Sequence, residues 1–358
     1  MANLFFLVSG EFETLSFAEL KAILEAEGYK YKVTEKLDQT VRIQADPECV
    51  KQVLRRSAYT RICSQELFTC DANDQAVEEA ANGTDFSSVL AEGETFEVRI
   101  RRIREYAEKD ATMDYERKLG KLILQNASHA KVNLKHADKT FFGVLTNGKL
   151  VFGVKLAEIV PKPFVERRAR KKPFFHPSAM NAKLARCMVN LAHAKTGTYV
   201  LDPFSGTGST LIEAALIGCK AVGIDVQRRM ANGTLRNVRH FDLAPEGIII
   251  ADARKLPLSH VDCVVTDPPY GRSSTTLKSN TKAIVEGVLA SAYPLLGKGQ
   301  RICIALPIKG NILKPNSLVR MSAEIKDLID SLGYRKLESH ELYYHRSLTR
   351  EVIVYEKT

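Results

Sequence analysis

The sequence lacks the features that would place the protein in a membrane or in an oxidising compartment. No run approaches the roughly 18 apolar residues of a membrane-spanning helix, and the N-terminus lacks the organisation of a signal peptide. The seven cysteines are scattered, odd in number and contain no C-x-x-C pair, which argues against a zinc site and against a disulfide framework. We therefore expect a soluble, cytoplasmic protein without a metal site.

Length and charge set the remaining limits. A chain of 358 residues allows two or three domains, and 45% hydrophobic residues are enough to bury their cores. The formal net charge of +10 favours a polyanionic partner. Because many soluble enzymes are basic, the charge by itself does not identify that partner.

The first 72 residues predict a small α+β domain of ferredoxin-like fold. Apolar strands and helices follow one another in the order β-α-β-β-α-β. Ser16, with Glu19 three residues later, forms a capping-box pattern that would begin the first helix. We place these elements at residues 4–8, 16–28, 31–37, 41–45, 48–56 and 61–68. A fold of this kind does not by itself indicate a function.

Residues 73–160 predict a second domain with one basic strand. In residues 96–103 apolar side chains alternate with Arg99 and Arg101, so that both arginines lie on one face of the strand. Asn147 and Gly148 then mark a tight hairpin between two alternating strands. The arginine face is either a solvated sheet surface or a phosphate-binding surface, and we favour the second.

Residues 161–178 predict a basic linker that contains prolines. Six basic residues and one acid lie between Pro161 and Pro173, and we expect this stretch to be extended. A charged run is ordinarily only solvated. Arg167, Arg168 and Arg170 are nevertheless our candidates for contacts with a phosphate backbone.

Residues 179–358 predict a doubly wound α/β domain. Strands and helices alternate from residue 181 onward, and two final strands near 336–344 and 351–355 close the sequence. In such domains the ligand lies at the carboxyl ends of the strands. The strand ends are therefore where we expect the functional residues.

A glycine-rich turn follows the first of these strands. The segment LDPFSGTG, residues 201–208, leads from an apolar strand into a helix, and Gly206 and Gly208 would let the backbone approach a ligand closely. A dinucleotide fingerprint would need a third glycine where Leu211 stands. The negative charge of Asp202 would repel a pyrophosphate, whereas it could bind the ammonium group of a methionine moiety.

Two further acids follow the next two strands. Asp225 ends the first of them, where a carboxylate can accept hydrogen bonds from both hydroxyls of a ribose. Asp252 would face an adenine amino group, with the backbone of Ala253 as a further contact. Each acid alone is often a helix cap or a turn residue. Three acids at successive strand ends, however, predict a pocket for S-adenosyl-L-methionine.

The segment DPPYG, residues 267–271, is the most specific motif of the chain. An exocyclic amine on an aromatic base is a poor nucleophile because its lone pair is delocalised into the ring. The Asp267 carboxylate and the Pro268 carbonyl can accept its N–H bonds, and Pro268 and Pro269 fix the backbone around them. Tyr270 can stack on the base, and Asp267 can take up the released proton. The motif therefore predicts methylation of an amino group.

Several of these segments resemble the tRNA guanosine-10 N2-methyltransferase family. The resemblance lies in residues 174–192, 201–218, 222–227 and 267–274 and in the tail motif HRSLTR at 345–350. Residues 132–156 resemble a THUMP domain, the RNA-binding module of these enzymes, and residues 1–72 fit the domain that precedes it. The resemblance covers essentially the whole chain and agrees with the domain order.

The resemblance implies a Rossmann-fold methyltransferase that acts on the N2 amine of guanosine 10 in tRNA, with the THUMP domain gripping the acceptor end. It leaves open whether one or two methyl groups are added and whether a small zinc-ribbon activator subunit is needed. Asp267, Pro268, Pro269 and Tyr270 take the catalytic positions, and Arg272 is a candidate RNA contact. His345 and Arg346 are candidates for contacts with the RNA or with the active-site loop. The candidate cofactor contacts are Phe175, His176, Pro177, Asp202, Pro203, Phe204, Ser205, Gly206, Thr207, Gly208, Asp225, Val226, Asp252, Ala253 and Asp267.

Three alternatives remain at this stage. A DNA amino-methyltransferase shares the D-P-P-Y motif, but it would more naturally carry a domain that reads DNA sequence. A ribosomal RNA methyltransferase is closer, because THUMP-like modules also occur there. A non-catalytic RNA-binding protein would be expected to have lost Asp267 or the glycine turn, and both are present.

Overall fold

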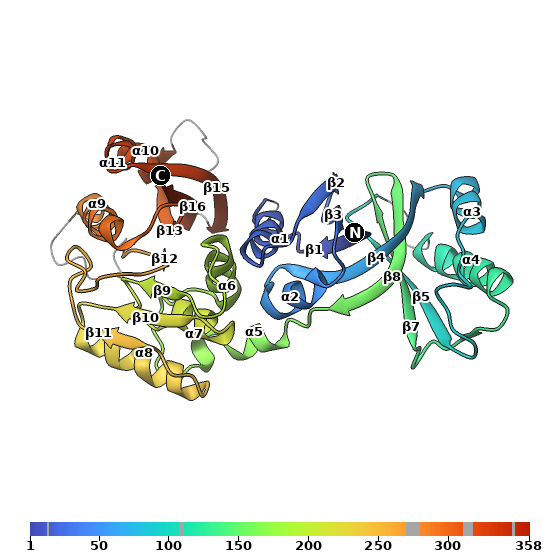
Figure 1. The fold of residues 1–358 in the computed structure, drawn as a ribbon, viewed down its shortest axis with the longest axis horizontal. Helices are drawn as coiled ribbons and strands as arrows, with labels where there is room; N and C mark the ends of the chain where they lie inside the picture. Colours follow the sequence, from blue (N-terminus) through green and yellow to red (C-terminus); the bar gives the residue numbers. More distant parts are fainter. Residues whose placement is uncertain (13, 107–110, 270–279, 311–317, 346–347) are drawn as a thin grey trace. The chain divides into compact units, whose positions relative to one another are not determined.

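The chain forms two compact units in a computed structural model that describes residues 1–12, 14–106, 111–269, 280–310, 318–345 and 348–358 (Figure 1). The first unit comprises Met1–Phe17, Gly28–Leu54 and Tyr59–Val160. The second comprises Ala18–Glu27, Arg55–Ala58 and Pro161–Thr358. Within the described residues, no helix is long and apolar enough to cross a membrane.

The first unit is built on one continuous eight-stranded sheet. The spatial order is β2-β3-β1-β4-β8-β7-β5-β6, in which β5 runs parallel to β6 and β7 and all other neighbours are antiparallel. Strand β4 pairs with β1 on one side and with β8 on the other, so the two predicted N-terminal domains share this sheet. The strands are β1 (Ala2–Val8), β2 (Tyr31–Leu37), β3 (Thr40–Ala45), β4 (Thr60–Asp71), β5 (Thr95–Arg102), β6 (Lys131–Val132), β7 (Lys139–Thr146) and β8 (Lys149–Glu158).

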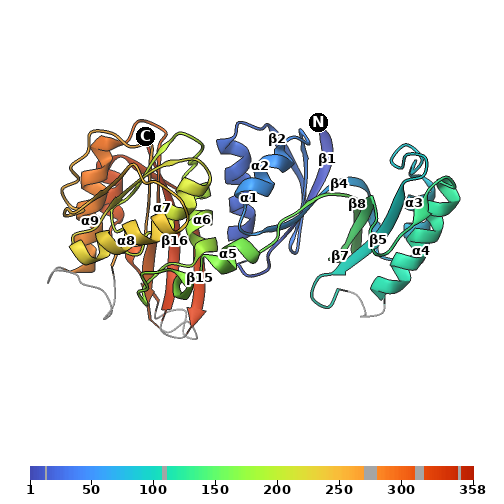
Figure 2. The ribbon, with the colours of Figure 1, turned by 90° about the horizontal axis from the view of Figure 1, so that it is seen from below.

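Helices α3 (Asp74–Asn82) and α4 (Ala111–Asn126) lie side by side and cover the half of this sheet that contains β5 and β7 (Figure 2). Their apolar side chains, such as Val77 and Leu119, form one core with Phe96 and Phe141 of the strands. The tight hairpin between β7 and β8 is confirmed. Asn147 and the following glycine both adopt the left-handed backbone conformation that this turn type requires.

The predicted capping box at the start of α1 (Leu15–Ala26) is wrong. Ser16 lies inside the helix, and its hydroxyl donates to the carbonyl oxygens of Ser9 (2.9 Å) and Phe12 (3.1 Å). Glu19 is fully buried, and its carboxylate accepts hydrogen bonds from the Ser57 hydroxyl at 2.7 Å and from the backbone N–H of Ala58, which follows α2 (Cys49–Arg56). Tertiary contacts therefore outweigh the local capping pattern.

The second unit is the predicted doubly wound α/β domain. Its sheet has the order β11-β10-β9-β12-β13-β16-β15, and a short β14 pairs with the end of β13. The first five strands are parallel, and β16 is antiparallel to both of its neighbours. The strands are β9 (Tyr199–Asp202), β10 (Lys220–Ile224), β11 (Gly247–Ile249), β12 (Cys263–Thr266), β13 (Arg301–Lys309), β14 (Val319–Arg320), β15 (Tyr334–His345) and β16 (Leu348–Lys357).

The order in which the strands are added reverses between β9 and β12, because β9 leads outward to β10 and β12 leads the other way to β13. Right-handed crossovers in opposite directions place the connecting helices on opposite faces of the sheet. Helices α9 and α11 thus pack into one large core with the strands. The helices are α6 (Ala182–Leu191), α7 (Ser209–Leu216), α8 (Arg228–His240), α9 (Thr281–Ala292), α10 (Met321–Glu324) and α11 (Lys326–Leu332), with a 3-10 turn at Tyr293–Leu295.

The segment that precedes this domain differs from the expected extended linker. It contains the short helix α5 (Lys162–Glu166) and a 3-10 turn at Ala169–Lys171, and both belong to the second unit. Pro163 lies in the first turn of α5, where the missing N–H of a proline costs no hydrogen bond. The buried side chain of Phe164 anchors the helix.

Candidate active site

Four adjacent parallel strands of the second unit each lead to an aspartate. Strands β11, β10, β9 and β12 lie side by side in this order. The aspartates that follow them or end them are Asp252, Asp225, Asp202 and Asp267, respectively. Because the carboxyl ends of parallel strands meet at one edge of a sheet, all four predicted acids lie at the same edge. Asp202 and Asp267 flank the point at which the strand order reverses.

The turn between β9 and α7 depends on its two glycines. Gly206 has a φ of +55° and Gly208, which begins α7, has a φ of +78°. A Cβ on Gly208 would lie 3.0 Å from Cγ2 of Thr234 in α8. The Thr234 hydroxyl donates to the Gly206 carbonyl at 2.9 Å. Helix α8 thus holds the turn closely enough to exclude a side chain at Gly208.

Asp202 ends β9 and is almost completely buried, with 3% of its surface exposed. Its Oδ1 accepts hydrogen bonds from the backbone N–H of Phe204 (3.1 Å) and from the Thr266 hydroxyl (2.8 Å). Burial raises the pKa of Asp202 to about 7, against the lowering effect of these hydrogen bonds, and the charge of Asp267 adds to the rise. A cationic group that binds beside Asp202 would stabilise its ionised form.

Asp225 follows β10 and contacts the glycine turn directly. Its Oδ2 accepts from the Gly206 N–H at 3.1 Å, and its Oδ1 accepts from the Gln227 N–H at 2.9 Å. Burial raises the pKa of Asp225, while these two backbone hydrogen bonds lower it. The neighbouring Val226 is exposed, so the loop is accessible at this position.

Asp252 lies in the loop after β11, next to the buried Ala253. Its carboxylate accepts hydrogen bonds from the Arg254 guanidinium, with 2.6 Å between Arg254 Nη2 and Asp252 Oδ2. Hydrogen bonding to Arg254 lowers the pKa of Asp252. The Arg254 side chain lies against Gly287 of α9, where a Cβ would approach its Cγ to 2.7 Å. A ligand that binds Asp252 would therefore share this carboxylate with Arg254.

The predicted cofactor segment at residues 175–177 is anchored through its neighbour Phe174. The Phe174 backbone exchanges two hydrogen bonds with the Asn237 side chain of α8, at 2.8 and 2.9 Å. The same Asn237 amide donates to the Thr207 carbonyl in the glycine turn at 2.9 Å. Phe175 is exposed, and His176 Nδ1 lies 2.7 Å from the Ser178 hydroxyl oxygen. Asn237, which the sequence analysis missed, therefore joins the two predicted segments.

Asp267 follows β12 and forms an ion pair with Arg350 of β16. The distance between Asp267 Oδ2 and Arg350 Nη2 is 3.2 Å, and the side chains are 15% and 12% exposed. Arg350 is opposite Pro307 of β13, and β13 pairs with β12 at its other edge. The ion pair therefore bridges β13. Pro268 is buried and Pro269 is half-buried.

The other motif residues can be followed only in part. Tyr270, Arg272 and Arg346 lie outside the residues that the structure describes. His345 is the last residue of β15, and its proposed RNA contact stays a prediction. Among the described residues of the tail motif, Arg350 reaches a predicted catalytic group, and the sequence analysis had assigned it no role.

One of the predicted phosphate contacts is part of a buried cluster. Arg167 Nε lies 2.6 Å from Glu213 Oε1, and Arg186 Nη2 lies 2.8 Å from the other oxygen of the same carboxylate. Glu213 is 1% exposed, and the Arg167 guanidinium lies over the Phe164 ring. Arg167 is thus held inside the second unit by Glu213, which argues against the predicted RNA contact. Arg168 remains exposed.

Lys172 places a buried positive charge beside the first turn of α7. Its Nζ donates to the Ser209 hydroxyl at 2.7 Å, and this hydroxyl donates to the Met180 carbonyl at 3.0 Å. Burial lowers the pKa of Lys172 to about 8. The basic segment before the domain therefore supports the glycine turn, whereas its residues Arg168 and Arg170 face solvent.

The residues around the glycine turn fit S-adenosylmethionine by their chemistry. Asp202 offers a carboxylate for a cationic amino group, and Asp225 offers one for ribose hydroxyls. The Ser205 hydroxyl is buried in the same turn and has no hydrogen-bond partner among the residues that the structure describes. Buried hydroxyls are normally satisfied, so Ser205 indicates that a ligand completes this turn.

Comparisons with known proteins agree with this geometry. A family model described as an RMKL-like methyltransferase domain matches residues 168–325, and one described as a DNA methylase matches residues 71–235. The chain is 36% identical to the tRNA (guanine(10)-N2)-dimethyltransferase of Methanothermobacter thermautotrophicus over 98% of both chains. It is 30% identical to the protein of the same name from Methanocaldococcus jannaschii, over 98% of this chain and 99% of that one.

A solved structure extends the agreement to the fold. SMU.472, crystallised in complex with SAH, matches with a TM-score of 0.54 at 13% identity over 100% of this chain and 98% of that chain. Fold and site together define a methyltransferase that uses S-adenosylmethionine and has a Rossmann-like catalytic domain. The chain belongs to the tRNA (guanine(10)-N2)-methyltransferase family.

Proposed function

We propose that this chain methylates the exocyclic N2 amine of guanosine 10 in tRNA, and that two successive transfers give N2,N2-dimethylguanosine. The observation that carries the proposal is the position of Asp202 and Asp267 on either side of the strand reversal, with the glycine turn between β9 and α7 beside them. Two relatives that match over nearly their full length are named as dimethyltransferases, which supports the second transfer.

The glycine turn and its neighbours hold the methyl donor in this proposal. Asp202 binds the ammonium group, Asp225 binds the ribose hydroxyls, and the Ser205 hydroxyl gains a partner. S-adenosylmethionine supplies an electrophilic methyl group when it is bound there. Asn237 and Thr234 keep the turn and the segment after Phe174 in register, because each donates a hydrogen bond to a carbonyl of the turn.

Asp267 and Pro268 orient the target amine. The carboxylate and the Pro268 carbonyl accept its two N–H bonds, which directs the nitrogen lone pair away from the base ring and toward the methyl group. Transfer leaves the nitrogen with one proton too many, and we assign Asp267 as its acceptor. For the second transfer one N–H remains, so one of the two acceptors is sufficient. Stacking of Tyr270 on the base stays a prediction from the motif.

We further propose the domain boundaries 1–72, 73–160, 161–178 and 179–358, with a THUMP-type RNA-binding domain at 73–160. The substrate is a polyanion, and the chain carries a net charge of +10. In the family match described as a DNA methylase, the alignment ends at residue 235, before Asp267. That match therefore says nothing about the base that the catalytic motif accepts.

The test is methyl transfer by the purified chain alone to an unmodified tRNA transcript, followed by nucleoside analysis and mapping. We expect N2-methylguanosine at position 10 first and N2,N2-dimethylguanosine later in the time course. A transcript with adenosine at position 10 should accept no methyl group. The Asp267→Ala variant should bind S-adenosylmethionine and fail to transfer. Activity without any added protein would show that no activator subunit is required.

Parallel reactions with ribosomal RNA and with duplex DNA test the alternatives. Methylation of either one at a rate above that of tRNA would refute the tRNA proposal. If Asp267→Ala still transferred methyl groups to tRNA, the substrate assignment would stand, but another residue would have to orient the amine.

A further inference from the structure

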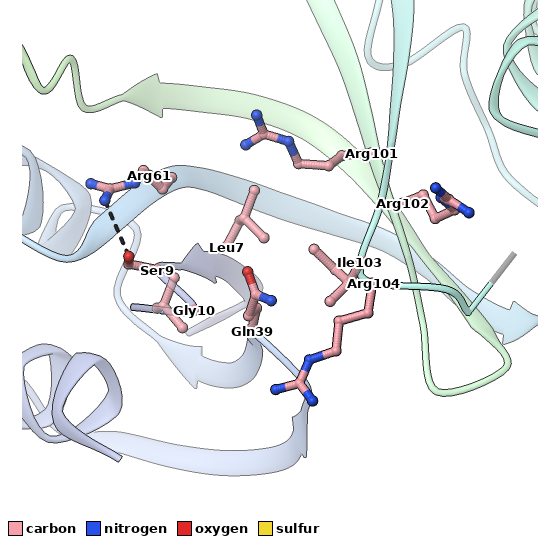
Figure 3. A pocket seen from close by; sticks show the side chains of 10 residues that line it. Leu7, Ser9, Gly10, Gln39, Arg61, Arg101, Arg102, Ile103 and Arg104 are labelled. Carbon is pink, nitrogen blue, oxygen red and sulfur yellow. Dashed lines mark hydrogen bonds between the residues drawn. The ribbon is translucent and has the colours of Figure 1, made fainter. Parts of the chain in front are cut away.

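The first unit contains a pocket of about 290 Å³ whose charged lining residues are all arginines (Figure 3). It is formed by the end of β1 and the loop after it, the turn between β2 and β3, the start of β4 and the end of β5. None of its ten lining residues is acidic. Its arginines are Arg61, Arg101, Arg102 and Arg104.

In Figure 3, Arg61, Arg101 and Arg104 lie at different edges of the pocket with Gln39 between them, whereas Arg102 lies on the other side of β5. Arg61 Nη2 is 3.2 Å from the Ser9 hydroxyl oxygen, and Arg104 Nε is 2.8 Å from Asp38 Oδ2. Arg101 is exposed, and in the described part of the chain it makes neither an ion pair nor a hydrogen bond. The lining therefore contributes four guanidinium groups and no carboxylate, and Arg104 pairs with Asp38 beside the pocket.

The contacts of Arg101 differ from those of Arg99, which lies on the same face of β5. Arg99 pairs with Glu97 Oε2 at 2.6 Å, and its Nη2 donates to the Leu134 carbonyl at 3.1 Å. The basic face of β5 that the sequence predicts is therefore neutralised at Arg99. The part of this face that lines the pocket is Arg101, near the end of β5.

Two residues that line the pocket have an unfavourable backbone conformation. Gln39 has a φ of +55° and Arg104 has a φ of +46°, a region in which glycine or asparagine is the usual choice. Gly10 leaves room for the Gln39 amide, because a Cβ there would lie 2.7 Å from Gln39 Nε2. Gly10 thus gives the Gln39 side chain the room it occupies beside the pocket.

We propose that this pocket binds a phosphate group of the tRNA. Guanidinium groups present paired N–H donors that match phosphate oxygens, and several of them around one pocket favour an anion with three or four oxygens. The Gln39 amide can donate one more hydrogen bond. The proposal rests on tRNA being the substrate. The phosphate can be an internal phosphodiester of the backbone or the terminal 5′-phosphate, and these two sources can be told apart.

The experiment compares Arg101→Gln and Arg104→Gln with Arg117→Gln. Arg117 is a matched control, since it is a 75% exposed arginine of α4 in the same unit and lies outside the pocket. We measure the dissociation constant for tRNA by filter binding between 50 and 300 mM salt. Each pocket variant should bind roughly three- to tenfold more weakly, and its salt slope should fall by about one. The control should change neither quantity.

Two further measurements separate this site from the active site. At saturating tRNA the pocket variants should methylate guanosine 10 at the wild-type rate, so that only KM changes. Binding of tRNA with a 5′-hydroxyl identifies the source. If the pocket variants and the wild type bind it equally, the pocket holds the 5′-phosphate, whereas a deficit that persists assigns an internal phosphodiester.

Pocket variants that match Arg117→Gln in affinity and in salt slope would overturn the proposal. Because Arg101 is exposed, Arg101→Gln should unfold at the wild-type temperature, so that its affinity loss cannot come from misfolding. A wild-type chain that binds tRNA but does not methylate it, even with an activator subunit added, would refute the proposed function and leave the binding comparison interpretable.

Discussion

Arg350 and Asp267 form an ion pair across β13, with 3.2 Å between Arg350 Nη2 and Asp267 Oδ2. Both side chains are largely buried, so solvent screens the pair less than it screens a surface ion pair. Asp267 is the residue that we assign to the target amine. Its orientation and its charge are therefore coupled to a strand that lies outside the cofactor loops.

We predict that Arg350→Gln lowers the rate of methyl transfer by about 10²-fold, because a small displacement of the acceptor misaligns the amine. The dissociation constant for S-adenosylmethionine should not change. Single-turnover rates as a function of pH provide the readout. Without the neighbouring cation the carboxylate is easier to protonate, so the acid limb of the profile should move to higher pH.

Arg350→Lys and Arg335→Gln are the comparisons for this prediction. The lysine keeps the charge and should restore part of the rate. Arg335 forms a surface ion pair with Glu356 on the same hairpin at 2.6 Å, so its loss tests whether any broken pair in β15 and β16 has this effect. An unchanged acid limb in Arg350→Gln would mean that Arg350 acts only on stability.

Cofactor binding should depend on pH through Asp202. Burial raises the pKa of Asp202 to about 7 in the free protein, with Asp267 as a nearby charge. A cationic ligand favours the ionised form, so binding below pH 7 must release a proton and becomes weaker as the pH falls. We expect affinity about tenfold lower at pH 6 than at pH 8, measured by calorimetry.

The Asp202→Asn variant should bind weakly and with a flat pH dependence, whereas Asp225→Asn should keep the slope. A flat profile in the wild-type protein would exclude Asp202 as the partner of the ammonium group.

Substitution of Gly208 tests whether the glycine turn contacts the cofactor, apart from its effect on backbone strain. Gly208→Ala should destabilise the fold by roughly 1–3 kcal/mol because its φ is +78° and its Cβ would meet Thr234. It should also weaken S-adenosylmethionine binding. Gly197→Ala is the control, because Gly197 has a φ of +86° and nothing within 4 Å of the added Cβ. Equal cofactor affinity in the two variants would show that the Gly208 turn does not contact the ligand.

The four strand-end aspartates could be predicted because a parallel sheet fixes where its strands end. Once strands and helices alternate, the residue after each strand is placed at one edge whatever the details of packing are. Asp202, Asp225 and Asp267 are at the positions that this rule gives. The tight hairpin at Asn147 was predictable for a similar reason, because its backbone conformation is local.

Contacts between distant segments were not predictable in this way. Asn237 bonds to Phe174 across 63 residues of sequence, and nothing in either local pattern indicates the partner. Two local patterns also misled the sequence analysis. Glu19 does not cap the helix but accepts hydrogen bonds in a buried network. Arg167 forms an ion pair with the buried Glu213 and does not face solvent as a phosphate contact would. In each case burial of a charged group with a partner outweighs the surface role that the sequence suggests.

The cluster around Glu213 should dominate the stability of the second unit. This carboxylate is 1% exposed and is shared by Arg167 and Arg186, and burial lowers the pKa of Arg186. Glu213→Ala leaves two guanidinium groups in a low-dielectric environment without their anion, which should cost about 3–5 kcal/mol in the free energy of unfolding. Urea denaturation followed by circular dichroism measures this loss.

Glu341→Ala is the matched surface control for the Glu213 prediction. Glu341 pairs with Arg320 at 2.6 Å, but both side chains are more than 40% exposed, so its removal should cost about 0–1 kcal/mol. Because α7 carries Glu213 and begins at Gly208, Glu213→Ala should also weaken S-adenosylmethionine binding at temperatures at which the protein remains folded. If Glu213→Ala were no less stable than Glu341→Ala, the two buried arginines would have found other partners, and the cluster would not be what holds the segment before α6 to the catalytic domain.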